Sequence, residues 1–157
     1  MKLSEIGSQE CSIARALSVV GDGWMLVILR DAFRGHRRFA EFEEHSGAQS
    51  TVISDRLKRM VDLGLLDRVE YQQYPSRHEY RLTDKGRDLY PALLMLSTWG
   101  DTYLDDGNGP PVAYVHTGCG HDADPRVTCS HCGDEIDVRS VRAVPTKTQT
   151  TADRSTP

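Results

Sequence analysis

Hydrophobic residues in the first part of the chain repeat at helical spacing. Ile13, Leu17 and Val20 follow an i, i+4, i+7 pattern, and Gly21 and Gly23 come directly after them. This pattern predicts an amphipathic helix that ends at the glycines. The next stretch, WMLVILRDAF, is apolar on almost every side. It predicts a helix buried in the core of a small domain.

A short helix, a turn and a longer helix are predicted next. Phe39 and Phe42 anchor the short helix, and Gly47 provides the turn after it. Ser50 is predicted to be the N-cap of the longer helix, and Gly64 is placed to end that helix as its C-cap residue. The longer helix carries apolar residues at helical spacing, namely Ile53, Leu57 and Met60.

The period of the pattern then changes from helical to alternating. LLDRVEY and HEYRL both alternate, and QQYPS between them contains a proline and a serine, which predicts a two-stranded hairpin with a long tip. Thr83 can cap one more helix, which Pro91 is expected to kink because proline lacks a backbone donor. The apolar stripe of this last helix consists of Leu89, Leu93, Leu96 and Tyr103, with Leu94, Met95 and Trp99 beside it.

The order of these elements predicts a mainly α fold with a small β-hairpin wing, which is a winged helix-turn-helix. From Cys11 to about residue 104 the chain carries the landmarks W, ILRD, RRF, RL, GL, EYRLTDKG and WG in that order. With these landmarks it resembles an HxlR-type winged helix-turn-helix transcriptional regulator. The resemblance implies a dimeric, cytoplasmic, DNA-binding regulator without catalytic activity of its own.

Length and composition are compatible with this interpretation. The chain has 157 residues, of which 38% are hydrophobic and 27% charged, and this suits one domain of roughly 100 residues with appendages. No apolar run approaches the roughly 18 to 20 residues that span a bilayer, and MKLSEIGSQE lacks the profile of a signal peptide. We therefore expect a cytoplasmic protein without membrane contact. The net charge of -4 does not favour nucleic acid, but binding to phosphate depends on a local basic face.

A DNA-reading surface is predicted at the start of the longer helix, opposite its apolar repeat. Its polar and cationic residues are Gln49, Ser50, Thr51, Ser54, Arg56 and Lys58. Arg37 and Arg38 before the short helix, and Arg77 and His78 at the wing tip, are candidates for phosphate or minor-groove contacts. For one charge taken alone, a solvated surface is the better interpretation. The nearby acidic residues should point away from DNA or toward the dimer, and they are Glu41, Glu43, Glu44, Asp55 and Asp62.

The apolar stripe from Leu89 to Tyr103 is predicted to be covered by a second copy of the chain. A domain of this size has little core left for a helix of about 20 residues, so a partner chain is the simplest cover. A symmetric homodimer would bind an inverted-repeat operator in double-stranded DNA, with its two recognition helices about one turn apart. We expect such a regulator to be a repressor.

Three of the four cysteines and three of the six histidines lie within residues 115–135. HTGCG and CSHCG repeat one pattern, in which a ligand is followed after two residues by cysteine and then glycine. His116 with Cys119, and Cys129 with Cys132, are therefore predicted to hold a structural Zn²⁺ in a zinc-ribbon-like module. His121 is an alternative fourth ligand, although only His116 preserves the repeat.

Other interpretations of the cysteine-rich segment remain open. It could be a flexible tail with free thiols, a metal-sensing site, or a module that docks a partner protein. It could also be a zinc enzyme site in which water fills the fourth position, but a short ribbon offers no obvious cleft for a substrate. The predicted segments are an N-terminus at 1–10 that is flexible, a DNA-binding and dimerisation domain at 11–106, a linker at 107–113, the zinc-ribbon-like module at 114–139 and a disordered tail at 140–157.

Cys11 stands apart from the other cysteines, at the start of the first predicted helix. The helix dipole favours a thiolate there, so Cys11 is a candidate sensor of oxidants. Some members of the HxlR-type family respond in this way, which raises the possibility by resemblance. The alternative is a small buried residue that packs beneath the dimer helix. No feature of the sequence identifies a small-molecule effector.

Overall fold

The structure, a computed structural model, describes residues 6–144. The chain divides into two compact units, Met1–Pro111 and Val112–Pro157. Residues 1–5 of the predicted flexible N-terminus and residues 145–157 of the predicted disordered tail lie outside the described part.

Two helices open the first unit. Helix α2 spans Ser12–Val20, and helix α3 spans Gly23–Phe33. Asp22 between them caps α3, since its carboxylate accepts a hydrogen bond of 3.0 Å from the Trp24 backbone N–H. Helix α3 is the central core helix, as its apolar sequence predicts, and its buried residues are Met25, Ile28, Leu29, Asp31 and Ala32.

Helices α4, Phe39–Ser46, and α5, Ser50–Asp62, form the predicted helix-turn-helix. Gly47 ends α4 in the left-handed conformation with φ of 72°, which confirms the predicted turn. The N-cap of α5 is Gln49, and no side chain caps this end. The prediction that Ser50 caps α5 is therefore wrong, because Ser50 already has a helical position and its hydroxyl bonds to Glu43 instead.

The end of α5 is a Schellman motif. Gly64 has φ of 67°, and its N–H donates to the Val61 carbonyl at 2.9 Å. The Leu65 N–H donates to the Met60 carbonyl, also at 2.9 Å. Gly64 thus ends the helix as predicted, although the C-cap position itself belongs to Leu63 and Gly64 follows it.

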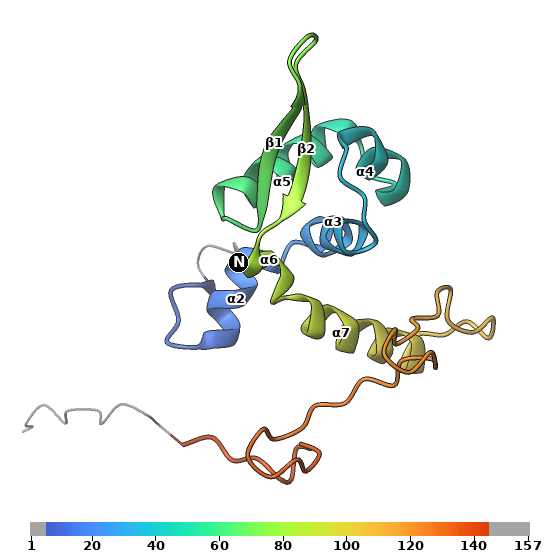
Figure 1. Cartoon of the computed structure of the whole chain (residues 1–157). Helices are drawn as coiled ribbons and strands as arrows, with labels where there is room; N and C mark the ends of the chain where they lie inside the picture. The colour runs from blue at the N-terminus through green and yellow to red at the C-terminus, as the bar shows by residue number, and fades with distance from the viewer. Residues whose placement is uncertain (1–5, 145–157) are drawn as a thin grey trace, which may run out of the picture. The chain divides into compact units, whose positions relative to one another are not determined.

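The predicted wing is present as an antiparallel hairpin of β1, Leu66–Gln72, and β2, Arg77–Leu82. Pairing runs from Leu66 opposite Leu82 toward the tip, and an irregularity lies between Glu70 and Gln72. The tip of the hairpin projects beyond the helices (Figure 1). The base of the hairpin is anchored in the core, because Leu66 is almost completely buried.

The last helical segment differs from the single kinked helix that the sequence predicts. It consists of a four-residue turn, α6 at Asp84–Arg87, and a separate helix α7 at Tyr90–Tyr103. Thr83 caps α6 as predicted, since its hydroxyl accepts from the Gly86 N–H at 3.0 Å. Pro91 lies in the first turn of α7. Pro91 therefore lies at the beginning of a new helix and does not kink an existing one, because the N–H groups of a helix's first turn have no partner within the helix.

The hydrophobic core lies where α3, α4, α5 and the base of the wing meet. Phe42 and Tyr80 contact edge to face, with ring centroids 6.3 Å apart, and so join α4 to β2. No residue of α7 is buried within the chain.

Among the described residues, no single helix is long and apolar enough to cross a bilayer. Helices α2 and α3 meet that test only jointly, with a bend of 77° at their break.

The described part of the second unit, residues 112–144, contains no helix or extended strand. Its regular pairing is limited to two antiparallel bridges, Val115 with Asp122 and Thr128 with Glu135. Each bridge closes one of the two cysteine-containing turns.

Candidate nucleic-acid interface and metal ligands

The exposed face of α5 presents the polar residues predicted to read DNA. The buried face consists of Ile53, Leu57 and Met60, which are completely shielded from solvent. On the other side, five predicted contact residues are exposed, namely Gln49, Ser50, Thr51, Ser54 and Lys58. The amphipathic pattern of α5 therefore places the predicted surface on the outside, next to the turn from α4.

Two acidic residues of α4 are held by hydrogen bonds near this surface. Glu41 accepts the backbone N–H groups of Arg37 at 2.7 Å and Arg38 at 2.8 Å. These two bonds hold the pKa of Glu41 below its ordinary value. Glu43 accepts a short hydrogen bond from the Ser50 hydroxyl. Glu43 consequently lies beside the predicted reading surface, whereas the sequence led us to expect that it faces away.

Arg56 holds the start of α3 against α5. Its Nη2 lies 2.8 Å from Oδ2 of Asp22, its Nε donates to the same oxygen at 3.0 Å, and it also pairs with Asp55. Burial alone would raise the pKa of Asp22, but the hydrogen bond and charge of Arg56, together with the backbone N–H groups of Trp24 and Met25, outweigh it and leave that pKa lowered. The same pairing raises the pKa of Arg56. Its role as a DNA contact stays a prediction, and the structure gives it a positioning role.

Arg37 and Arg38 connect α4 to the wing. The Arg37 carbonyl accepts the Tyr80 N–H of β2 at 2.7 Å. The guanidinium carbon of Arg38 lies 5.1 Å from the centre of the Tyr71 ring in β1. Both arginine side chains are exposed. The two contacts with Tyr80 and Tyr71 fix the position of this segment relative to the wing.

The wing tip carries more candidate contacts than the sequence indicated. Arg77 is exposed, while His78 is half-buried, with its Nδ1 3.2 Å from Nη2 of Arg68. Arg68 and Tyr74, which is 91% exposed, also lie on the wing and were not predicted as contacts. The pairing of the two strands could have identified Arg68 as a candidate contact. Arg68 lies opposite Tyr80, which is two residues from His78, so Arg68 and His78 are on the same face of the hairpin.

Among the residues that the structure describes, large apolar side chains of α2, of α7 and of the residue after α7 are exposed. The rings of Trp99 and Tyr103 contact each other in a tilted arrangement, with centroids 5.6 Å apart, and both are largely exposed, at 53% and 70%. The other large exposed apolar side chains of these elements are Ile13, Leu17, Tyr90, Leu96 and Leu104.

Cys11 is exposed and is the N-cap residue of α2. Cys11 is therefore not buried within the single chain, and its packing beneath the dimer helix stays a prediction. All four cysteines are free thiols in the structure, so Cys11 is available for chemistry at the end of a helix.

The predicted metal ligands form two pairs. In the first, Nδ1 of His116 lies 3.3 Å from Sγ of Cys119. In the second, backbone N–H groups of His131 and Cys132 donate to the Cys129 sulfur, and these bonds lower the Cys129 pKa. Among residues 6–144, no group of three or more His, Cys, Asp or Glu side chains is positioned around a common point for a metal. The structure does not bring the two pairs together, and their role as metal ligands stays a prediction.

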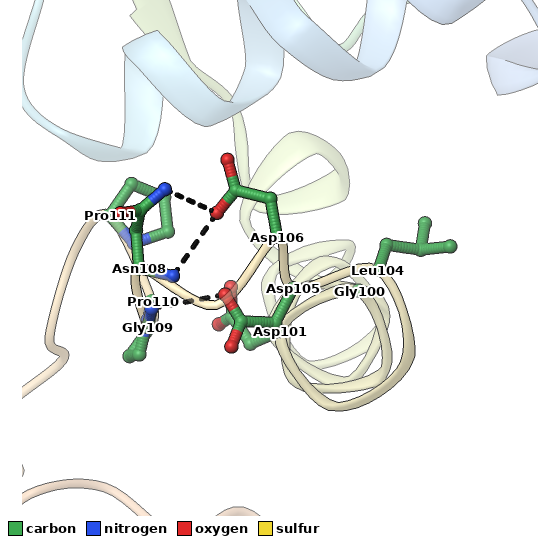
Figure 2. A pocket seen from close by; sticks show the side chains of 9 residues that line it. All are labelled: Gly100, Asp101, Leu104, Asp105, Asp106, Asn108, Gly109, Pro110 and Pro111. Carbon is green, nitrogen blue, oxygen red and sulfur yellow. Dashed lines mark hydrogen bonds between the residues drawn. The ribbon is translucent and has the colours of Figure 1, made fainter.

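A hollow of about 390 Å³ lies at the end of α7 and the segment after it. Two of its acidic side chains accept hydrogen bonds from neighbouring residues of the hollow itself. Asp106 accepts hydrogen bonds from the side chain and backbone of Asn108, and Asp105 accepts from the Gly109 N–H at 3.0 Å (Figure 2). The bonds from Asn108 lower the pKa of Asp106. These carboxylates organise the turn that leaves α7.

The chain is similar to known transcriptional regulators. The HxlR-like helix-turn-helix family matches residues 19–108. The HTH-type transcriptional regulator MT3179 of Mycobacterium tuberculosis is 50% identical over 134 residues, which cover 85% of this chain and 85% of the relative. The redox regulator HypR in its oxidised form matches with a TM-score of 0.57 at 29% identity, over 60% of this chain and 99% of that chain.

The crystal structure of PA1607 is similar over a longer part of the chain. It matches with a TM-score of 0.79 at 33% identity, and the match covers 89% of this chain and 98% of that chain. Since the family match ends at residue 108, this similarity includes part of the C-terminal unit. The helix-turn-helix, the wing and these relatives agree: the chain belongs to the HxlR-like helix-turn-helix family of DNA-binding transcriptional regulators, which are not enzymes.

Proposed function

We propose that the protein is a homodimeric repressor that binds an inverted-repeat operator in double-stranded DNA, in the cytoplasm. The observation that carries the proposal is the exposed polar start of α5, next to the α4 turn and flanked by the wing. Side chains such as Gln49 can pair with base edges, while the wing cations contact phosphate. Repression is the simplest outcome, because it requires only that the dimer occupies the DNA.

The proposed dimer uses the exposed apolar surface of α2 and α7. A helix of 14 residues with no buried residue leaves a large apolar area in water, which is unfavourable for a lone chain. A second copy that packs the same surface against it gives a closed two-fold dimer. The two α5 helices would then be available to two half-sites of DNA.

Oxidants are the proposed signal, with Cys11 as the responding thiol. Cys11 is exposed at the start of α2, on the same helix that carries part of the proposed dimer surface. Modification there would change the packing between the copies and hence the spacing of the α5 helices. HypR, which matches this chain, is named as a redox regulator, and that name supports the choice of oxidants over small-molecule ligands.

For the C-terminal unit we propose a structural zinc site in a zinc-ribbon-like module. Its two turns place candidate ligands in pairs, and none of its described residues is buried. A metal can supply the folding free energy that such a unit lacks. A structural site predicts tight binding, whereas metal sensing would need an ion that exchanges.

Selection of genomic fragments by the purified full-length protein tests the DNA proposal. We expect enrichment of one inverted repeat and a dimer in light-scattering measurements. Gln49→Ala should change the preferred sequence, whereas Arg77→Ala should weaken binding to all sequences and reduce its salt dependence. Arg142→Ala, an exposed cation of the C-terminal unit, is the matched control and should change neither.

Three outcomes would overturn parts of this proposal. A folded protein that enriches no sequence, with and without a thiol reductant, would contradict operator binding. An unchanged sequence preference in Gln49→Ala would show that α5 is not the reading helix. A reporter gene that is transcribed more strongly when the protein is present would exclude repression.

A further inference from the structure

The two cysteine-containing turns of the C-terminal unit have the same backbone geometry. The N–H groups of His116 and Cys129 each donate, at 2.9 Å, to the carbonyl five residues later. The N–H groups of Gly120 and Gly133 donate back to His116 and Cys129 at 2.8 and 2.7 Å. Both glycines have positive φ, 74° and 82°, which other residues rarely adopt. The repeat in the sequence is therefore also a repeat in structure.

We infer that these turns are two preformed half-sites that close on a single zinc ion. The ion is bound by Nδ1 of His116 and by the sulfur atoms of Cys119, Cys129 and Cys132. This inference rests on the structural zinc site proposed for the C-terminal unit. It adds the ligand atoms, the choice between the histidines and the movement that brings the turns together.

The distance within the first turn fits a tetrahedral site. Zinc–nitrogen bonds of about 2.05 Å and zinc–sulfur bonds of about 2.3 Å, at a tetrahedral angle, separate the two ligand atoms by about 3.6 Å. Nδ1 of His116 and Sγ of Cys119 are 3.3 Å apart. A shift of a few tenths of an ångström therefore suffices for both atoms to bind one ion.

The residue between the ligands explains why His116, and not His121, belongs to the site. A Cβ at Gly118 would lie 3.0 Å from Cε1 of the His116 ring, so the ring packs over a position that only glycine leaves free. In the second turn the first ligand is the smaller Cys129, and the matching position is occupied by His131. His121 contributes its backbone carbonyl to the His116 N–H, which makes it part of the frame of the turn.

The second turn is prepared for a metal through its backbone. The Cys129 N–H donates to the Asp134 carbonyl at 2.9 Å, and the Gly133 N–H donates to the Cys129 carbonyl at 2.7 Å, so the backbone of this residue is held from both sides. Beside this turn, Arg126 forms ion pairs with Asp124 and with Glu135, at 3.0 Å each. These local bonds orient the sulfur before any ion arrives.

Closure on one ion follows from the number of ligands. Each turn supplies two, while structural zinc takes four. Within residues 6–144, neither turn has a third His, Cys, Asp or Glu side chain at hand. The two further ligands that each turn needs are then supplied by the other turn. The unit becomes compact when one ion binds both turns.

Cobalt titration of the metal-free, full-length protein under reducing conditions tests the inference, because Co²⁺ reports its ligands by absorbance. We expect one equivalent per chain, a tetrahedral spectrum with strong sulfur-to-cobalt charge transfer, and displacement by Zn²⁺. His116→Ala should lower the affinity roughly tenfold or more. His121→Ala and His131→Ala remove only side chains and keep the backbone groups that form the turns, so these matched controls should leave the affinity unchanged.

Each other outcome has a distinct meaning. Two ions per chain, or one ion per two chains with metal-dependent association, would overturn closure within one chain while keeping a metal site. Loss of affinity in His121→Ala but not in His116→Ala would overturn the ligand assignment alone. No binding of cobalt or zinc would overturn both this inference and the zinc site on which it rests. Operator binding is measured separately and is not decided by these results.

Discussion

The two units of the chain are stabilised in different ways. In the N-terminal unit, large side chains such as Phe42, Ile53 and Met60 are completely shielded from solvent. In the C-terminal unit, no residue among the described 112–144 is buried. The first unit draws its stability from hydrophobic burial, and the second depends on local backbone bonds and, as we propose, on a metal. A perturbation of one unit should therefore leave the other intact.

Phe42→Ala should give the largest effect and should be confined to the N-terminal unit. Phe42 is completely buried where α4 packs on the core, and its ring also contacts Tyr80 of the wing. Truncation of a buried phenylalanine leaves a cavity and costs about 3 to 5 kcal/mol in the free energy of unfolding. Urea unfolding followed by helical circular dichroism measures this loss.

The zinc content of the same variant tests whether the units are separate. At low urea Phe42→Ala should bind as much zinc as the parent, because all of the proposed ligands belong to the C-terminal unit. If zinc is lost in parallel with the helical signal, the two units fold as one and the comparison fails.

Gly86→Ala should give the next largest effect. Gly86 is buried in α6, and an added Cβ would clash with the Leu65 carbonyl oxygen at the base of the wing. Backbone cannot rotate away as a side chain can, so we expect a loss of about 1 to 3 kcal/mol. Gly23→Ala, also helical but with open space around its Cβ, is the control and should not destabilise. Equal unfolding midpoints for the two variants would contradict the close approach of α6 to the wing.

Local patterns in the sequence predict the helices and strands well, whereas the residues at which the helices begin and end are predicted less well. The apolar run before Phe33 and the alternation in the wing are strong periodic signals, and both elements formed as predicted. The missing backbone donor of Pro91 predicts a kink, yet a proline is equally suited to the first turn of a new helix. Ser50 has a capping side chain, but the carboxylate of Glu43 competes for its hydroxyl. Only the tertiary arrangement decides such cases.

The candidate DNA surface was partly predictable for the same reason. The exposure of Gln49 and Thr51 follows from the apolar repeat on the opposite face of α5. The pairing of Arg56 with Asp22 does not, because it joins residues 34 positions apart in the sequence. In the cysteine-rich segment, spacing predicted both pairs of ligands, and whether they meet at one ion stays a prediction.

Arg56→Met tests the ion pair that connects α5 to the start of α3. Arg56 lowers the pKa of Asp22 against the opposing effect of burial. A carboxyl group with a lowered pKa in the folded state stabilises above its unfolded pKa, and this contribution is lost as the pH falls through the folded value. At pH 7 we expect the variant to be less stable by about 1 kcal/mol, since the pair is partly exposed.

Urea unfolding as a function of pH separates this ion pair from general packing. The stability difference between Arg56→Met and the parent should shrink as the pH falls below about 3.9, the ordinary pKa of an aspartate. In the background of Asp22→Asn, the Arg56 substitution should have a smaller effect at pH 7. A difference that is constant across this range would assign the effect of Arg56 to its aliphatic packing.

Gly118→Ala should have the smallest effect on stability and acts on the C-terminal unit alone. The new methyl group would meet the His116 ring at 3.0 Å and push Nδ1 away from its position near Cys119. We expect weaker zinc binding in competition with a chelator and no change in urea unfolding of the helices. His131→Ala changes the matching position of the second turn, where no ring lies above, and should bind zinc as the parent does. If Gly118→Ala also retains parental affinity, the ring of His116 is free to bind from another direction, and Gly118 is not what sets the geometry of the site.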